Sequence, residues 1–228
     1  FPILRNILTK IMGESIYKSP TDMGVNMISK CITDDKAVRE AANMEIIRRY
    51  YNALADYKQE LCTKEEVQRI EILMNKLELS KDMRKVANAA LQKQDESNKE
   101  VVAIELQNGK ILTGKQSELL SATSAMLINA LKEINHIPDD VYLLSADVLE
   151  KILKMKKHTS YKTSYCLNVQ EVLIALSICS SINPIIEKTL KNLEALNGTE
   201  AHSTYIIEKS EMNVLKNLGI NLTCEPRM

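Results

Sequence analysis

Several residue types are scarce in this chain of 228 residues, and each shortage excludes a class of protein. The chain has no tryptophan, one phenylalanine and eight tyrosines, so it has few of the aromatic side chains on which single-stranded nucleic acids stack. Lysine plus arginine equals aspartate plus glutamate at 30 each. A formal net charge of zero provides no long-range attraction for a nucleic acid or an anionic membrane. We therefore expect no nucleic-acid partner.

The chain also lacks the signals of membrane, secreted and metal-binding proteins. No apolar run approaches the length of a membrane span, and no signal peptide is visible. The five cysteines are widely spaced and odd in number, which favours a reducing compartment over a disulfide framework. Neither Cys-x-x-Cys nor His-Glu-x-x-His occurs. We predict a cytoplasmic protein with no membrane partner and no metal site.

Helical periodicity dominates the first part of the chain. Thr63 and Glu66 have the spacing of a capping box, and Ser80 is placed to cap a further helix. Residues 92–100 then contain no apolar side chain, which is typical of a boundary between domains. We predict a helical subdomain over residues 1–94, with a polar loop at 17–26.

The pattern changes after residue 94. Asn108-Gly109 favours a hairpin turn, because both residues accept positive φ. We expect a strand at 141–144, and a strand, a helix and a parallel strand at 204–208, 211–217 and 220–224. Residues 95–228 are therefore predicted to form a layered helix and sheet domain with about five strands. The expected fold class is α+β or mixed α/β.

The densest polar segment is Tyr-Lys-Ser-Pro-Thr-Asp-Met-Gly-Val-Asn, at residues 17–26. A lysine beside hydroxyl groups can hold a phosphate or carboxylate, and Asp22 can orient a nucleophile or a magnesium ion. The same residue types also make a good turn and helix cap, and both interpretations stay open. Asp22 is thus a candidate catalytic residue, and the candidate anion- or substrate-binding residues are Lys18, Ser19, Thr21 and Asn26.

Three further residues are candidates for anion binding. Gly-Lys-Gln-Ser at residues 114–117 is similar to the end of a phosphate-binding loop, in which helix N–H groups and a lysine attract anions. Gly109 lies one position too close to complete that motif, so an ordinary strand-to-helix turn is the alternative. Lys115 and Ser117 are nevertheless candidates. Arg48 is another, although a solvated helix face also explains it.

Glu200 and His202 form the second polar motif. A loop that enters a sheet can present a histidine as a general base, with a carboxylate to orient it. The two residues are two positions apart, so they would share one face of an extended strand. The alternative is an exposed histidine beside a sheet edge. We take His202 and Glu200 as candidate catalytic residues.

Several motifs together resemble the bacterial domain-of-unknown-function 1846 family. They are Met-Gly-Glu-Ser at 12–15, the segment 17–27, Gly-Lys-Ile-Leu-Thr-Gly-Lys at 109–115, Asn-Pro at 183–184, Glu-Ala-His-Ser-Thr at 200–204 and the closing segment 218–226. Proteins of that family are about twice as long and carry a phosphate-loop-like segment in their N-terminal half. The resemblance implies that this chain is the C-terminal half of such a bacterial cytosolic protein. Some members are labelled ATP-dependent peptidases.

Two functions are consistent with these observations. In the first, the chain is the substrate-binding half of a nucleotide- or phosphate-dependent enzyme. The polar loop and His202 would then share a cleft with the missing N-terminal half and hold a small anionic ligand. In the second, the chain is a helical interaction or oligomerisation module without catalytic activity, for example in a homo-oligomer. The sequence identifies no cofactor and leaves open whether the protein is an enzyme.

Overall fold

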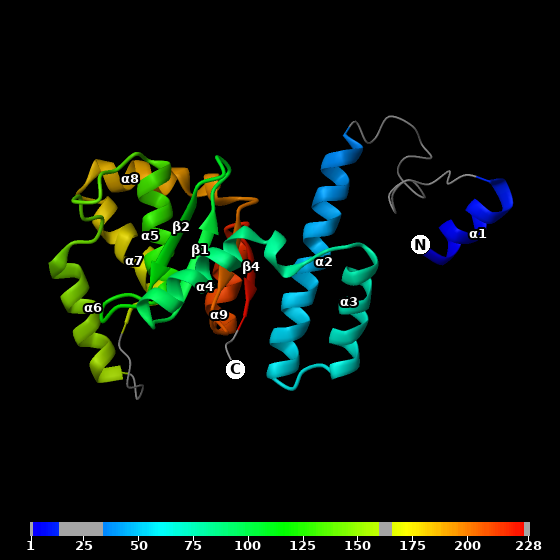
Figure 1. Cartoon of the computed structure of the whole chain (residues 1–228). Coiled ribbons are helices and arrows are strands. Elements are labelled where there is room, and N and C mark those ends of the chain that lie inside the picture. The colour runs from blue at the N-terminus through cyan, green and yellow to red at the C-terminus, as the bar shows by residue number, and fades with distance from the viewer. Residues whose placement is uncertain (1, 14–33, 160–165, 226–228) are drawn as a thin grey trace. The chain divides into compact units, whose positions relative to one another are not determined.

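The computed structural model in Figure 1 describes residues 2–13, 34–159 and 166–225. The candidate residues Lys18, Ser19, Thr21, Asp22 and Asn26 therefore lie outside the described residues. The chain divides into two compact units, Phe1–Ile47 and Arg48–Met228. The sequence-based domain boundary near residue 94 stays a prediction.

The first unit contains helix α1 (Pro2–Met12) and the beginning of helix α2 (Asp35–Lys58). The carboxylate of Asp34 accepts a hydrogen bond from the backbone N–H of Ala37 at 2.9 Å, which satisfies a free donor in the first turn of α2. On α1, Ile3, Ile7 and Ile11 recur at four-residue spacing, and all three are exposed.

The second unit begins with helices, as the periodicity predicted. α2 is followed by α3 (Lys64–Lys76), a short 3₁₀ helix (Lys81–Met83) and α4 (Lys85–Ser97). Thr63 occupies the N-cap position of α3, but its side chain makes no capping hydrogen bond there. The predicted capping box at Thr63 is therefore not formed. Ser80 precedes the 3₁₀ helix, and Arg84 occupies the N-cap position of α4.

The second unit is built on a mixed four-stranded sheet with the order β2-β1-β3-β4. Strand β1 (Val101–Glu105) pairs antiparallel with β2 (Ile111–Lys115) and with β3 (Glu200–Ser203), whereas β3 and β4 (Asn221–Cys224) are parallel. Gly109 has the positive φ of +79° that the hairpin turn requires. Helix α9 (Lys209–Asn217) joins the parallel pair. The mixed α/β class is confirmed.

Two of the predicted strands are wrong. Residues 141–144 are irregular chain that buries Leu143 and Leu144 in the core, which shows that a short apolar run need not pair in a sheet. The strand expected at 204–208 ends earlier, at Ser203. The hydroxyl of Ser203 bonds both the N–H and the C=O of Tyr205, at 3.2 and 2.8 Å, and so turns the chain out of the sheet.

Helices cover both faces of the sheet (Figure 1). Alternate residues of β1 point to opposite sides: Val101 and Ala103 pack in the cluster that contains Val86 and Ala90 of α4. Val102 and Ile104 belong instead to the larger core cluster, which includes residues of α5 (Ala122–Ile134). An outer group of helices extends that side of the unit, and its members are α6 (Ala146–Thr159), α7 (Val169–Ser180) and α8 (Pro184–Lys191), followed by a 3₁₀ turn (Asn192–Leu196). None of the helices in the described part of the chain has the length and apolar character needed to cross a membrane.

Candidate functional site

Arg84 is fully buried at the start of α4 and is the centre of a polar network. Its Nε donates to the hydroxyl of Thr223 at 2.9 Å. Its Nη2 donates to the carbonyl oxygens of Ala201 and Asn221, at 2.7 and 3.0 Å. Burial lowers the pKa of the guanidinium, while the neighbouring Glu200 raises it. Arg84 thus fastens α4 to β3 and β4 by directional bonds.

Glu200 is held in the same network by three donors. Nη1 of Arg84 and Nη1 of Arg48 each lie 2.5 Å from one of its carboxylate oxygens. The side-chain amide of Asn221 donates to it at 3.1 Å. Arg48, a candidate anion-binding residue, therefore already binds a carboxylate of its own chain. The side chains of Arg48 and Glu200 are each only about one-fifth exposed.

His202 lies on β3 with Glu200, as expected for two residues two positions apart in a strand. Its exposed fraction is 0 %, however, so the expectation of a loop histidine beside solvent is wrong. The physical reason is that β3 is an inner strand, flanked by β1 and β4. The two candidate catalytic residues are connected through Arg84 and the hydroxyl of Thr223.

The imidazole of His202 is held as a neutral ring. Its Nδ1 lies 2.9 Å from Oγ1 of Thr223, and the ring of Tyr51 packs edge-on with its centroid 4.8 Å away. Among the described residues, Nε2 has no hydrogen-bond partner, and a carboxylate oxygen of Glu225 lies 4.0 Å from it. Burial, with a smaller contribution from Arg84, lowers the pKa of His202 from 6.5 to about 3. An uncharged histidine without solvent contact suits a structural role.

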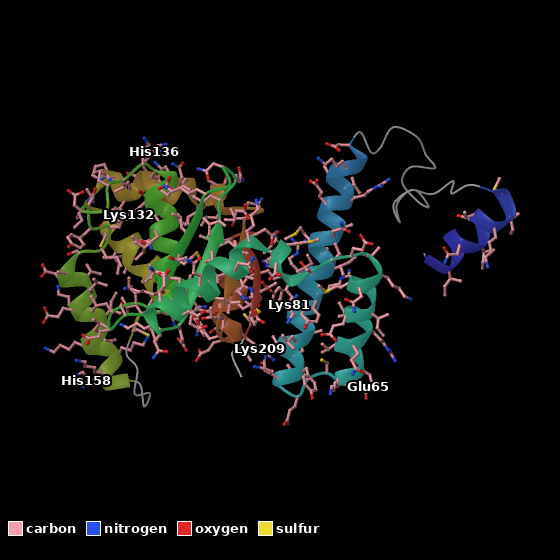
Figure 2. The ribbon with its side chains drawn as sticks, in the orientation of Figure 1. Glu65, Lys81, Lys132, His136, His158 and Lys209 are labelled. Atoms are coloured by element: carbon pink, nitrogen blue, oxygen red, sulfur yellow. The ribbon has the colours of Figure 1, made fainter. Side chains whose placement is uncertain are left out.

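Residues at the margin of this network are more accessible. Lys81, labelled in Figure 2, has its amine 5.0 Å from the ring centroid of Tyr50 and 4.0 Å from a carboxylate oxygen of Glu225.

The other two histidines, His136 and His158, are exposed and lie beyond the end of α5 and near the end of α6 (Figure 2). The three histidines therefore form no common site within the described residues.

The structure separates Lys115 and Ser117 from a helix N-terminus. Lys115 is the exposed last residue of β2, and α5 begins only at Ala122. The turn at residues 114–117 therefore does not lead directly into a helix N-terminus. The hydroxyl of Ser117 accepts a hydrogen bond from the N–H of Leu120 at 3.0 Å, within a turn. The resemblance of residues 114–117 to a phosphate-binding loop does not extend to its geometry.

Glu211 was missed in the sequence, although its carboxylate is buried among helix starts. One oxygen accepts hydrogen bonds from the hydroxyl of Thr123 at 2.6 Å, from the hydroxyl of Ser121 at 3.2 Å and from the N–H of Val169 at 3.0 Å. Ser121 is the N-cap of α5, and Val169 begins α7. The carboxylate therefore occupies the position that helix N-termini offer to an anion. The three hydroxyl residues Ser121, Thr123 and Ser124 were the available signal.

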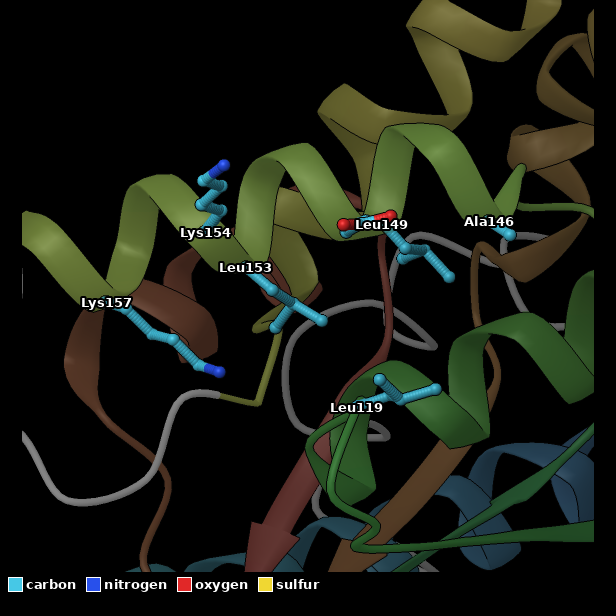
Figure 3. Close-up of a pocket in the computed structure, with 7 residues that line it drawn as sticks. Leu119, Ala146, Leu149, Leu153, Lys154 and Lys157 are labelled. Carbon is cyan, nitrogen blue, oxygen red and sulfur yellow. The ribbon is translucent and has the colours of Figure 1, made fainter.

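A groove along α6 is open to a ligand. It has a volume of about 600 Å³. In Figure 3, Leu149 and Leu153 point from α6 toward Leu119, and the amine of Lys157 extends on the same side of the helix. No carboxylate among the described residues pairs with Lys157, whereas Lys156 next to it bonds Glu171 at 2.6 Å. The groove is lined by Leu119, Ala146, Leu149, Glu150, Leu153, Lys154 and Lys157.

The groove thus brings apolar walls together with a lysine that has no carboxylate partner among the described residues. None of the residues selected from the sequence lines it. The sequence did not indicate that the leucines of α6 would face a segment about thirty residues earlier. The closely spaced lysines of α6, Lys151, Lys154 and Lys157, were the available signal.

Comparison with known proteins identifies the family. Residues 1–78 match the model described as domain of unknown function DUF1846, N-terminal, and residues 82–228 match that of DUF1846, C-terminal. The chain is 44% identical over 226 residues to UPF0371 protein str1377 of Streptococcus thermophilus, which covers 99% of this chain and 46% of that protein. It is 42% identical over 235 residues to a UPF0371 protein of Clostridium tetani, covering 99% and 47%. The chain belongs to this bacterial family, whose function is described as unknown.

The matches correct one prediction. The chain was expected to correspond to the C-terminal half of the family, but residues 1–78 match the N-terminal domain model. That expectation is therefore wrong. The polar segment 17–26 falls within the N-terminal match. The residues of the buried network at 84 and 200–223 fall within the C-terminal match. The chain spans about half the length of the curated relatives that it matches.

Proposed function

We propose that this chain binds a small anionic ligand in the groove along α6, as the substrate-binding part of a nucleotide- or phosphate-dependent enzyme of the bacterial cytoplasm. The observation that supports this is the position of Lys157. Its amine extends along a groove walled by leucines and has no carboxylate partner among the described residues. A lysine amine is a common partner for phosphate groups.

The size and polarity of the groove favour a nucleotide-like ligand. Its volume of about 600 Å³ lies within the range of small-molecule sites, which have mainly apolar walls and a few polar groups that fix orientation. Leu149 and Leu153 offer an apolar surface for a flat base, and Lys157 offers a charge for phosphate. Glu150, also in the lining, can accept a hydrogen bond from a sugar hydroxyl or an exocyclic amine.

The buried network supports the fold rather than the chemistry in this proposal. Glu200 is held by two arginines, and His202 is sealed from solvent. Their catalytic roles, and that of Asp22, stay predictions. Binding in the α6 groove depends on none of them.

A thermal-shift panel tests the proposal. The chain is heated with ATP, ADP, pyrophosphate and inorganic phosphate, each with and without magnesium. A ligand that binds the native state raises the midpoint as its concentration exceeds Kd. We expect a nucleotide to raise it, Lys157→Glu to abolish the rise, and Lys151→Glu, which changes an exposed lysine outside this groove on the same helix, to preserve it. A flat response to the whole panel contradicts the proposal.

An exposed helix face favours a second candidate function, that of an interaction module. The stripe on α1 exposes Ile3 by 77%, Ile7 by 48% and Ile11 by 74%. An amphipathic helix with an open apolar face commonly packs against another helix. If α1 mediates association, Ile7→Asp will lower the mass of the protein measured by light scattering, while nucleotide-induced thermal shifts stay unchanged. An unchanged mass contradicts this candidate.

A further inference from the structure

The surroundings of His202 determine which nitrogen of its buried ring carries the hydrogen. The ring is neutral near pH 7, because burial lowers its pKa to about 3. A neutral imidazole carries a hydrogen on only one of its two nitrogens, so one nitrogen donates and the other accepts. The partner of Nδ1 therefore decides what Nε2 can do.

The hydroxyl of Thr223 lies between Arg84 and His202. Nε of Arg84 donates to Oγ1 of Thr223 at 2.9 Å, and a guanidinium can only donate. The hydroxyl hydrogen therefore has two acceptors within reach, Nδ1 of His202 at 2.9 Å and the carbonyl oxygen of Ala201 at 3.4 Å. That carbonyl already accepts from Nη2 of Arg84 at 2.7 Å. The shorter separation favours donation to Nδ1.

Because Nδ1 accepts, Nε2 carries the hydrogen and needs an acceptor. The imidazole is sealed from solvent, so bulk water cannot serve as that acceptor. A carboxylate oxygen of Glu225 lies 4.0 Å from Nε2. A direct N–H···O bond is about 3 Å long, so the glutamate side chain forms it by moving about 1 Å. A buried donor without an acceptor is costly, which favours this closure.

Glu225 lies at the end of the parallel strand pair. It directly follows β4, and its backbone N–H donates to the carbonyl oxygen of Ser203 at 2.8 Å. Its other carboxylate oxygen lies 4.0 Å from the amine of Lys81, which begins the 3₁₀ helix before α4. The carboxylate therefore lies between a buried N–H donor and a surface ammonium group, both of which attract it.

We propose that His202 is fixed as its Nε2–H tautomer and that Glu225, its acceptor, clasps the end of β4 to the buried network. Hydrogen bonds then run in one direction, from Arg84 through Thr223 to His202 and on to the carboxylate. His202 is a positioning residue in this relay. Arg84 fastens the start of β4 through the carbonyl oxygen of Asn221, and the clasp fastens its end. No residue of the relay lines the groove along α6, so the relay does not depend on ligand binding there.

Nitrogen-15 NMR of the chain with labelled histidine tests the tautomer. His136→Gln and His158→Gln, combined in one protein, replace the two exposed histidines and leave His202 as the only signal. Correlations from the carbon-bound ring hydrogens then distinguish the protonated nitrogen from the unprotonated one. We expect Nε2 to be protonated at pH 7. A protonated Nδ1, or a mixture of both tautomers, would overturn the proposal.

Glu225→Ala in the same background tests the clasp. We expect the Nε2–H proton signal to move upfield, because its carboxylate acceptor is gone. The backbone N–H of residue 225 should exchange with solvent about tenfold faster, because the end of β4 opens more often. Glu194→Ala is the control, since it removes an exposed carboxylate elsewhere, and it should change neither value. An Nε2–H signal that stays in place in Glu225→Ala, or an exchange rate equal to that of the unchanged background, would overturn the clasp.

Discussion

Nη1 of Arg84 lies 2.5 Å from Oε2 of Glu200, across 116 positions of sequence. The same guanidinium bonds the backbone of β3 and β4 through Ala201 and Asn221. One buried side chain thus connects the start of α4 to the parallel strand pair. Because a buried ion pair is costly unless its hydrogen bonds are complete, the completeness of this network determines whether it stabilises the fold.

Replacing Arg84 will destabilise the protein strongly. Arg84→Ala leaves two backbone carbonyls and one carboxylate oxygen of the network without their donor, and we expect a loss of about 3–5 kcal/mol in the free energy of unfolding. Arg84→Lys should restore only part of it, since one ammonium cannot reproduce the planar set of donors. Urea denaturation measures both values.

Lys85→Ala serves as the control for this measurement, because Lys85 is the exposed neighbour in the first turn of α4. It should change stability by no more than about 0.5 kcal/mol. An Arg84→Ala protein as stable as the Lys85→Ala protein would show that the network is energetically neutral.

His202 will make the stability depend on pH. The native state keeps its imidazole neutral down to a pKa of about 3, whereas the ordinary value is 6.5. The unfolded chain therefore binds a proton below pH 6.5 that the native state does not, and the free energy of unfolding falls as pH decreases from 6.5 toward 3. The slope from this residue approaches about 1.4 kcal/mol per pH unit.

His202→Gln, which cannot take up that proton, isolates the effect. The difference in unfolding free energy between wild type and variant should shrink by about 2 kcal/mol between pH 7 and pH 5. Other titrating groups contribute to both proteins and cancel in the difference. A constant difference over that interval would mean that His202 takes up its proton in the native state with the same pKa as in the unfolded chain.

Local features of the fold could be predicted from the sequence. The Asn108-Gly109 turn and the capping box of Asn168 with Glu171 depend on residues within a few positions of each other, and both are formed. The parallel pair around α9 was also predictable, because a helix between two strands favours that arrangement. These features need no knowledge of distant segments.

The candidate site was harder to predict, because its surroundings come from distant segments. The shared face of Glu200 and His202 followed from strand geometry, but their burial depends on strands about 100 residues earlier and 20 residues later. Arg84 gave no signal of its own beyond a single charge before an apolar helix. The leucines of α6 likewise form a groove only because Leu119 lies opposite them.

Gly114 will tolerate no side chain. A Cβ at this position of β2 would lie 2.0 Å from the backbone N of Met126 and 2.6 Å from the carbonyl oxygen of Ala122. The glycine thus allows α5 to approach the strand closely. We expect Gly114→Ala to cost at least about 2 kcal/mol, because rigid backbone must move. Thermal and urea unfolding measure the loss.

Gly109→Ala is the comparison for this prediction. Gly109 has open space around its Cβ position but a φ of +79°, so alanine should cost about 1–2 kcal/mol through backbone strain alone. If Gly114→Ala is no more damaging than a conservative surface change, the close approach of α5 to β2 is not maintained in solution.

Binding along α6 is tested most directly by an equilibrium titration of the chain with a fluorescent ATP analogue, followed by displacement with unlabelled ATP. We predict saturable binding to one site per chain, displaced by ATP, weakened at least tenfold by Lys157→Glu and unchanged by Lys151→Glu. The factor of ten corresponds to about 1.4 kcal/mol, a reasonable contribution for one charge contact to phosphate. Absence of saturable binding, or equal weakening by both variants, would contradict the proposed ligand site.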